Sequence, residues 1–170
     1  MGTRALVEAF ESVDIATELA PFLRSFPIAE YDLDLTAFAD AELTAATDAR
    51  PHAPTREHAK PIAEASSYRA ILPALIMQGK DEVQKRIAAG ELETEFVVRP
   101  RVAATTTDGE PAAAFRDQIA DENLSVYVAD STPPFSLSIV DESLVQIGVS
   151  RGDGTRPDVL VQSTHTIVHD

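Results

Sequence analysis

Two arginines have the side chain and the position for binding an anion. Arg99 and Arg101 directly follow a predicted strand over 93–98, in a chain with 14 Lys and Arg against 28 Asp and Glu. In open α/β sheets, ligands bind in the crevice at the carboxyl ends of the parallel strands. Guanidinium groups hold carboxylates and phosphates through paired hydrogen bonds. This pattern predicts a site for an anionic metabolite, and the alternative is that both arginines pair with surface carboxylates.

Three other side chains are expected to shape the wall of this site. They are Tyr127 and Asp130, at the end of the next predicted strand, and Phe135, after the Pro133-Pro134 corner. Pro73 is expected at the equivalent end of the preceding strand. We therefore predict a ligand site made of these five residues: Arg99, Arg101, Tyr127, Asp130 and Phe135.

The sequence contains no recognisable catalytic or metal-binding motif. Cysteine is absent, and the common glycine-rich, serine-elbow and H-E-x-x-H patterns do not occur. His52 and His58 lack a third ligand at suitable spacing and are expected to be exposed, and His165 and His169 lack one too. His58-Ala59-Lys60 has the spacing of the His-x-Lys pair of phospholipase-D-type catalysis, without its downstream Asp or strand context. We predict no catalytic residue, metal or cofactor, and hence no enzyme.

Size and charge limit the classes of protein further. The length of 170 residues predicts a single domain. The apolar runs are too short for a membrane span or a signal segment, so we expect a cytoplasmic protein. The net charge is -14, which would repel DNA phosphates in dilute buffer. Acidic residues spread along the chain, few lysines and abundant Ala, Thr, Val and Asp are typical of a halophilic archaeal protein; the alternative is an ordinary acidic domain.

The elements that must position the arginines form an alternating pattern. Strands are predicted over 69–75 and 93–98 and from Leu124, with a helix over 78–89 closed by Gly90 and a second opening at Pro111. Strands that alternate with helices at these spacings lie parallel, with right-handed crossovers. The sequence predicts a parallel βαβαβ core.

Antiparallel strands complete the predicted sheet. Residues from Phe135 alternate and Leu144 to Val149 is an apolar run, which together predict a hairpin with its turn at 141–143, at one edge of the core. Short strands are predicted over 42–46 and 158–163, the latter after a turn at 152–154. The fold class is α/β, with a mixed sheet.

Three helical segments are predicted outside this core. A linker helix over 5–20 opens the chain, and Pro21 either starts a short second turn or bends the helix there. The apolar surface of this helix is buried either within the chain or against a second copy. A helix over 56–66 is interrupted by Pro61, or begins there. Residues 164–170 start like a helix that is cut off. We divide the chain into a linker and dimerisation segment, 1–27, and an effector-sensing domain, 28–170.

The order of elements resembles a known family. The resemblance is carried by four segments, which are Leu19 to Pro27, Arg69 to Pro73, Leu124 to Asp141 with its Tyr127, Asp130 and Pro134-Phe135, and Val159 to Ser163. The chain is similar to the effector, or middle, domain of the methanogenesis regulatory protein family, found in archaeal, especially haloarchaeal, helix-turn-helix regulators.

The resemblance implies a ligand-sensing and dimerising domain of a transcription regulator. It implies a homodimer that binds an unknown small molecule and contacts DNA only through an N-terminal winged helix absent from this chain. Two alternatives remain. One is a small α/β hydrolase using Asp130 or His165, and the other is a dimerisation domain without a ligand.

Overall fold

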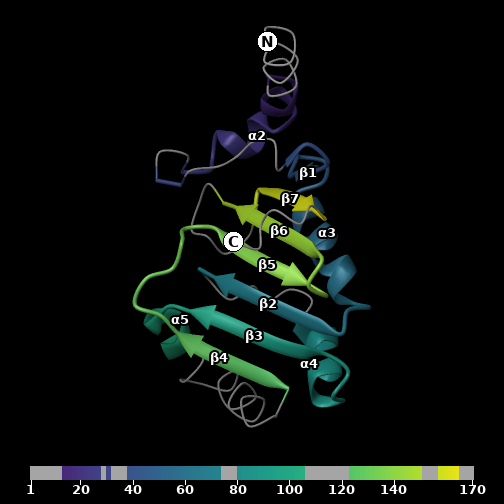
Figure 1. The fold of residues 1–170 in the computed structure, drawn as a ribbon, viewed down its shortest axis with the longest axis vertical. Coiled ribbons are helices and arrows are strands. Elements are labelled where there is room, and N and C mark those ends of the chain that lie inside the picture. The colour runs from purple at the N-terminus through teal and green to yellow at the C-terminus, as the bar shows by residue number, and fades with distance from the viewer. Residues whose placement is uncertain are drawn as a thin grey trace, which may run out of the picture.

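A seven-stranded mixed sheet forms the body of the protein, in the order β1-β7-β6-β5-β2-β3-β4 (Figure 1). The computed structural model describes residues 13–27, 30–31, 38–73, 80–105, 123–150 and 157–164. The strands are β1 (Glu42–Ala45), β2 (Ser67–Leu72), β3 (Glu93–Val98), β4 (Leu124–Val128), β5 (Ser136–Val140), β6 (Leu144–Val149) and β7 (Val159–Ser163). The predicted α/β class with a mixed sheet is confirmed.

Three neighbouring strands form the parallel part of the sheet. β2 pairs in parallel with β3, and β3 with β4, so that Leu72, Val98 and Val128 lie in one row. Helix α4 (Lys80–Ala88) crosses from β2 to β3. Gly90 follows α4 with a φ of 72°, a left-handed conformation that costs glycine little and that ends helices. The predicted parallel strands and the glycine cap are confirmed.

The antiparallel part begins with the predicted hairpin of β5 and β6. Asp141 and Glu142 in its turn have φ values of 48° and 57°, which match the right-handed twist of a tight hairpin. The Asp141 carboxylate accepts hydrogen bonds from the backbone N–H groups of Ser66 and Ser67, at 2.8 and 3.0 Å, and so ties the turn to β2. The hairpin lies beside β2, and β7 and β1 continue the sheet beyond it.

Helices α3 and α5 differ from their predicted positions. Helix α3 spans Ala53–Ile62, because Pro54 fits the first turn, and it contains Pro61 near its end. Helix α5 (Pro100–Thr105) starts directly after β3, where no helix was predicted. The predicted helices from Pro111 and over 164–170, and the turn at 152–154, lie outside the described residues.

The N-terminal segment packs onto the sheet. Residues 13–18 are helical, and the short α2 (Ala20–Leu23) follows with Pro21 in its first turn, as predicted. Phe22 is fully buried and stacks near Phe26, whose ring centroid lies 4.8 Å from that of Phe135. The apolar surface of residues 19–26 is therefore satisfied within the chain.

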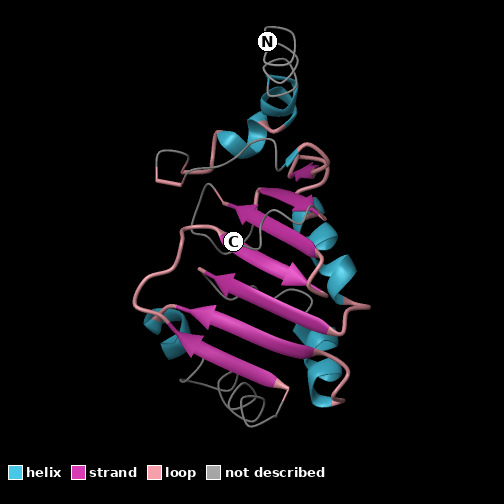
Figure 2. Ribbon diagram, viewed as in Figure 1, coloured by secondary structure: helices cyan, strands magenta, loops and turns pink. Residues whose placement is uncertain are grey.

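Two hydrophobic clusters cover opposite faces of the sheet, whose strands and helices are shown in Figure 2. Helices α3, α4 and α5 pack through Ile62, Ile87 and Val102 against one face. The aromatic residues of the N-terminal segment pack on the other face, against β6 and β7. No helix in the described part of the chain is long and apolar enough to span a membrane.

Candidate ligand site at the carboxyl edge of the sheet

The carboxyl ends of β2, β3 and β4 meet at one edge of the sheet. Pro73 follows β2, Arg99 follows β3, and Ala129 and Asp130 follow β4. The register is held to the very end of the strands, since the Ala129 N–H donates to the Val98 carbonyl at 2.9 Å. This parallel edge is the place at which an open α/β sheet binds ligands.

Arg99 is fixed at this edge by the loop after β4. Its Nε donates to the Thr132 hydroxyl at 2.8 Å, and one of its terminal nitrogens donates to the Thr132 carbonyl. Thr132 is buried, while Arg99 is half-buried. The Arg99 carbonyl also accepts from the N–H groups of Val102 and Ala103, which starts helix α5. A guanidinium has five N–H donors, so an arginine held in this way keeps donors for a second acceptor.

The other four predicted residues lie in different surroundings. Arg101 is exposed in the first turn of α5, and Asp130 is exposed in the loop after β4, so both share the edge with Arg99. Tyr127 lies on β4, the outer strand, and is 55% exposed. Phe135 is buried in the aromatic cluster, with its ring centroid 5.1 Å from that of Tyr31. The structure thus brings Arg99, Arg101 and Asp130 to one edge and places Phe135 in the core; ligand binding by any of them stays a prediction.

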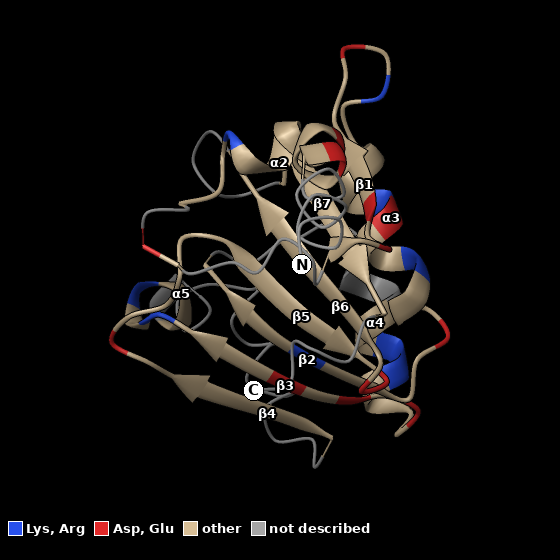
Figure 3. Ribbon diagram, turned by 45° about the horizontal axis from the view of Figure 1, so that its top comes forward, with Lys and Arg blue, Asp and Glu red and all other residues tan. Residues whose placement is uncertain are grey.

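Figure 3 shows how charge is distributed around the sheet. Basic residues lie on α5 at the carboxyl edge, and mixed basic and acidic residues lie on α3 at the opposite side. Among the described residues, the partner of the Arg99 side chain is the neutral Thr132 rather than a carboxylate. A positive charge held by neutral groups can still attract an anion.

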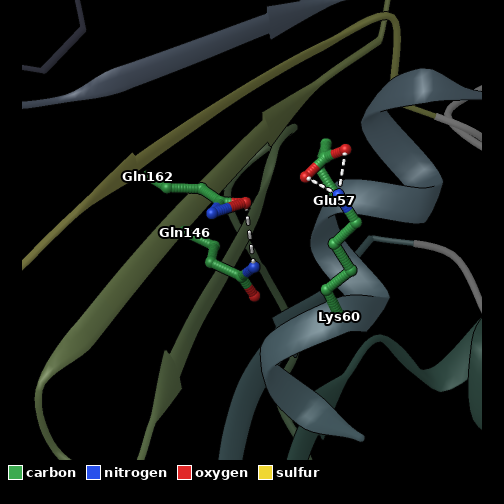
Figure 4. Close-up of polar contacts among 4 residues, drawn as sticks. All are labelled: Glu57, Lys60, Gln146 and Gln162. Atoms are coloured by element: carbon green, nitrogen blue, oxygen red, sulfur yellow. Dashed lines mark hydrogen bonds and ion pairs between the residues drawn. The ribbon is translucent and has the colours of Figure 1, made fainter.

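A second polar cluster, missed by the sequence reasoning, lies under helix α3. His58 Nε2 is 3.4 Å from both the Tyr68 hydroxyl and the Ser138 hydroxyl. The Ser138 hydroxyl donates to the Gln146 side-chain oxygen at 3.1 Å, and the Gln146 amide donates to the His58 carbonyl at 3.2 Å. The Gln146 amide also lies 3.4 Å from the Gln162 side-chain oxygen (Figure 4). We call these five residues the His58 cluster.

Burial sets the protonation state of the His58 cluster. Loss of solvent lowers the pKa of His58 from 6.5 to about 4, so the imidazole is neutral at neutral pH. The same cause raises the pKa of the Tyr68 hydroxyl well above its ordinary value. The prediction that His58 is exposed was wrong. Its helical spacing from Thr55 and Ile62, both buried, was the available signal.

The structure separates His58 from Lys60. Residues two apart on a helix point in different directions, whereas two apart on a strand they share a face. Lys60 is exposed and forms an ion pair with Glu57 at 2.7 Å (Figure 4), while His58 faces the sheet. His52 is exposed before α3. The described residues contain no cluster of three or more potential metal ligands.

Comparisons with solved structures identify the fold. The chain is similar to TrmBL2, an archaeal chromatin protein, with a TM-score of 0.55 and 13% identity over 97% of this chain and 59% of that chain. It is also similar to NucT from Helicobacter pylori, with a TM-score of 0.55 and 10% identity over 75% of this chain and 87% of that one.

A third similar structure is Nuc from Salmonella typhimurium, a phospholipase D family member, with a TM-score of 0.51 and 15% identity over 75% of this chain and 86% of that one. At these identities the likeness establishes the fold alone. No curated protein matches the sequence.

A family model assigns the chain to a protein family, whereas the solved structures identify only its fold. The model for the middle domain of the methanogenesis regulatory protein FilR1 matches residues 51–168. The match begins just before α3 and takes in the Arg99 edge and the His58 cluster, and it confirms the resemblance drawn from the sequence. The chain therefore belongs to the FilR1 middle-domain family, a family of regulatory domains.

Proposed function

We propose that this chain is the ligand-sensing and dimerising domain of a cytoplasmic transcription regulator. Its family is that of a regulatory middle domain, and a structural relative is an archaeal chromatin protein described as binding DNA. The chain spans 59% of the length of that relative. A regulator of that length would have room for a separate winged-helix domain that contacts DNA. A net charge of -14 supports this division, because the domain itself repels phosphates.

The observation that carries the proposal is the anchored Arg99. Thr132 holds the guanidinium at the carboxyl ends of β3 and β4, so little side-chain entropy is lost when an anion binds. Arg101 lies two residues further on, exposed, and can add a second positive charge. We infer that the ligand is a small carboxylate or phosphate. Its binding would regulate the protein by favouring one arrangement of the dimer over another.

We further propose that the domain is not an enzyme, although its fold occurs in phospholipase D family members. The reasoning is that the only His-x-Lys spacing lies on helix α3, with His58 turned inward and Lys60 paired with Glu57. Phosphodiester hydrolysis by the purified chain, lost in Asp130→Asn, would contradict this proposal.

A thermal-shift screen tests the sensing role. The chain is incubated with phosphorylated sugars and organic acids, and a ligand at a hundred times its Kd adds about 2.7 kcal/mol to the free energy of unfolding. We expect Arg101→Gln to weaken the stabilisation by the ligand without changing the melting temperature of the free protein. Arg69→Gln is the matched control, because Arg69 is an exposed arginine on β2 that pairs with Glu95 at 3.0 Å.

Arg99→Gln should lower both ligand stabilisation and the melting temperature of the free protein, since Arg99 also holds Thr132. A flat screen with folded protein would contradict ligand sensing and favour a dimerisation domain without a ligand. If the ligand stabilises Arg101→Gln and Arg69→Gln equally, the ligand site does not lie at this edge.

A further inference from the structure

Strand β4 is the last strand of the sheet on its parallel side. It pairs with β3, and no other described strand lies beside it (Figure 1). Two of its side chains, Tyr127 and Val128, are 55% and 56% exposed. They are the exposed large apolar residues of the described part of the sheet. An apolar edge strand of this kind is a template for pairing with another strand.

Two backbone hydrogen bonds show which backbone groups of β4 face outward. The Asn123 carbonyl accepts from Thr94, and the Ala129 N–H donates to Val98, so these odd-numbered residues face β3. Backbone direction alternates along a strand. The N–H and C=O groups of Leu124, Val126 and Val128 therefore point away from the sheet, with no described partner.

The residues of β4 themselves carry none of the charge, proline or bulge that protects an edge strand against pairing. Proteins shield edge strands with charged side chains, proline or bulges. Leu124 to Val128 reads LSVYV, without charge or proline, and its register with β3 runs without a bulge. Figure 3 shows β4 without a charged residue along its length, whereas β2 and β3 carry them.

We propose that β4 pairs antiparallel with β4 of a second copy of this chain, about a two-fold axis at Val126, so that two sheets join into one. The inference rests on the homodimer in the proposed function and names its surface. In this register Val126 faces Val126 of the partner, and Leu124 faces the partner's Val128. Each such pair exchanges two N–H···O bonds, because all of these residues present their backbone groups outward.

The side chains favour this register and a copy of the same strand. On one face of the joined sheet, the bulky Tyr127 lies opposite the small Ser125 of the partner, and on the other face apolar side chains meet apolar side chains. The strand has no charged residue, so it offers no charge with which a partner of opposite charge could pair. The same uncharged strand offers a second acidic copy a place to approach without like charges directly opposed.

Salt should strengthen this dimer. Each copy carries a net charge of -14, so the two copies repel each other over long range, and screening at high ionic strength removes that repulsion. One strand pair is also small beside a standard interface of about 1,600 Å². We therefore expect a dimer whose Kd falls as KCl is raised.

The first experiment compares Val128→Pro with Val128→Thr by analytical ultracentrifugation in molar KCl. Proline at position 128 removes an outward N–H that makes no bond to β3, and proline is tolerated on an edge strand with its nitrogen facing solvent. Threonine keeps both the N–H and the branched side chain. We expect Val128→Pro to raise the dimer Kd by at least about tenfold, with Val128→Thr close to wild type.

The second experiment needs no variant and so holds even where Val128→Pro fails to fold. Amide hydrogen exchange of the wild type is followed by NMR across a dilution series. Concentration should protect the amides of Leu124, Val126 and Val128, while those of Ser125 and Tyr127, already bonded to β3, should not change with dilution.

Three outcomes would overturn the inference in distinguishable ways. An unchanged dimer in Val128→Pro would place the homodimer interface elsewhere and leave the proposed dimer standing. Protection of the outward amides that does not vary with dilution would mean that another segment of the same chain covers β4. A wild type that stays monomeric in molar KCl would overturn both the β4 pairing and the dimer of the proposed function.

Discussion

The two halves of the sheet differ in how completely they are covered. In the antiparallel half, β6 is buried from Val145 to Val149, and β7 is buried at four of its five residues. In the parallel half, β4 is buried only at Leu124 and becomes exposed by Tyr127. The first half is packed on both faces, whereas the second keeps one face and one edge accessible. The antiparallel half is therefore the more deeply buried part of the sheet, and the parallel half is the more exposed part.

The difference has a simple physical origin. The N-terminal segment adds Phe22 and Phe26 to the face of β6 and β7 that α3 does not cover. On the same face of the parallel half, the exposed Arg69 of β2 is paired with the half-exposed Glu95 of β3. Exposed ion pairs contribute little stability, so this face holds the fold together weakly.

The largest expected effect on the free energy of unfolding comes from truncating the same type of side chain in each half of the sheet. Ile147 on β6 is buried and Ile71 on β2 is half-buried, and both point to the same face of the sheet. Ile147→Ala should cost about 2–5 kcal/mol through lost burial and a cavity. Ile71→Ala should cost clearly less, because part of its side chain is already in water. Urea unfolding measures both, and equal losses would contradict the comparison.

An intermediate effect is expected at Gly148, where β6 has no room for a side chain. A Cβ there would lie 2.5 Å from the Ser136 hydroxyl and 3.2 Å from Pro157 Cβ. Gly148→Ala should therefore destabilise the protein by about 1–3 kcal/mol through overpacking.

Ser136→Ala removes the nearer of these two atoms. In a double-mutant cycle of thermal unfolding, the cost of Gly148→Ala should be smaller in the Ser136→Ala background. Costs that simply add would show that Ser136 is not the obstacle, and that the packing of this half is looser than the structure indicates.

An effect of about the same size, but dependent on pH, is expected from His58. Its pKa is 6.5 in the unfolded chain and about 4 in the fold, so the unfolded state binds more protons between these values. The contribution to stability is complete above about pH 6.5 and is lost as the pH falls toward 4. Between pH 7.5 and pH 5 the loss should be about 2 kcal/mol.

The control for this prediction is His58→Gln, which keeps a polar side chain and removes the titration. The many carboxylates titrate in both proteins, so only the difference between their pH profiles reports on His58. If the stability of the two proteins changes in the same way with pH, the imidazole of His58 is not kept neutral by loss of solvent. Water would then reach this side chain in the folded protein.

Local patterns predicted most of the strands. Alternation and short apolar runs located β3, β4 and β6 within the residues that the structure gives them, and the polar segment Asp141–Ser143 indicated the hairpin turn between β5 and β6. Helix α5 was not predicted, because its six residues are too few to show a period. Pro100, at its first position, was the available signal.

The candidate site was predicted only in part. Placing Arg99 and Arg101 at the end of a parallel strand required nothing beyond the order of elements. That Thr132 would hold Arg99 depends on a contact across 33 residues of sequence, which no local pattern records. Phe135 was assigned to the site from its position after two prolines, but its side chain points to the aromatic cluster.

The sequence by itself determined the parallel core, the hairpin, the acidic surface and the family. These follow from periodicity, turn chemistry and composition, which are properties of residues near one another in the chain. Tertiary structure alone decided that His58 faces the sheet and is neutral, that Arg99 is anchored by Thr132, and that β4 is the outer strand. Each of these depends on which distant segments pack together, because burial and partners, rather than residue type, set the pKa, orientation and exposure of a side chain.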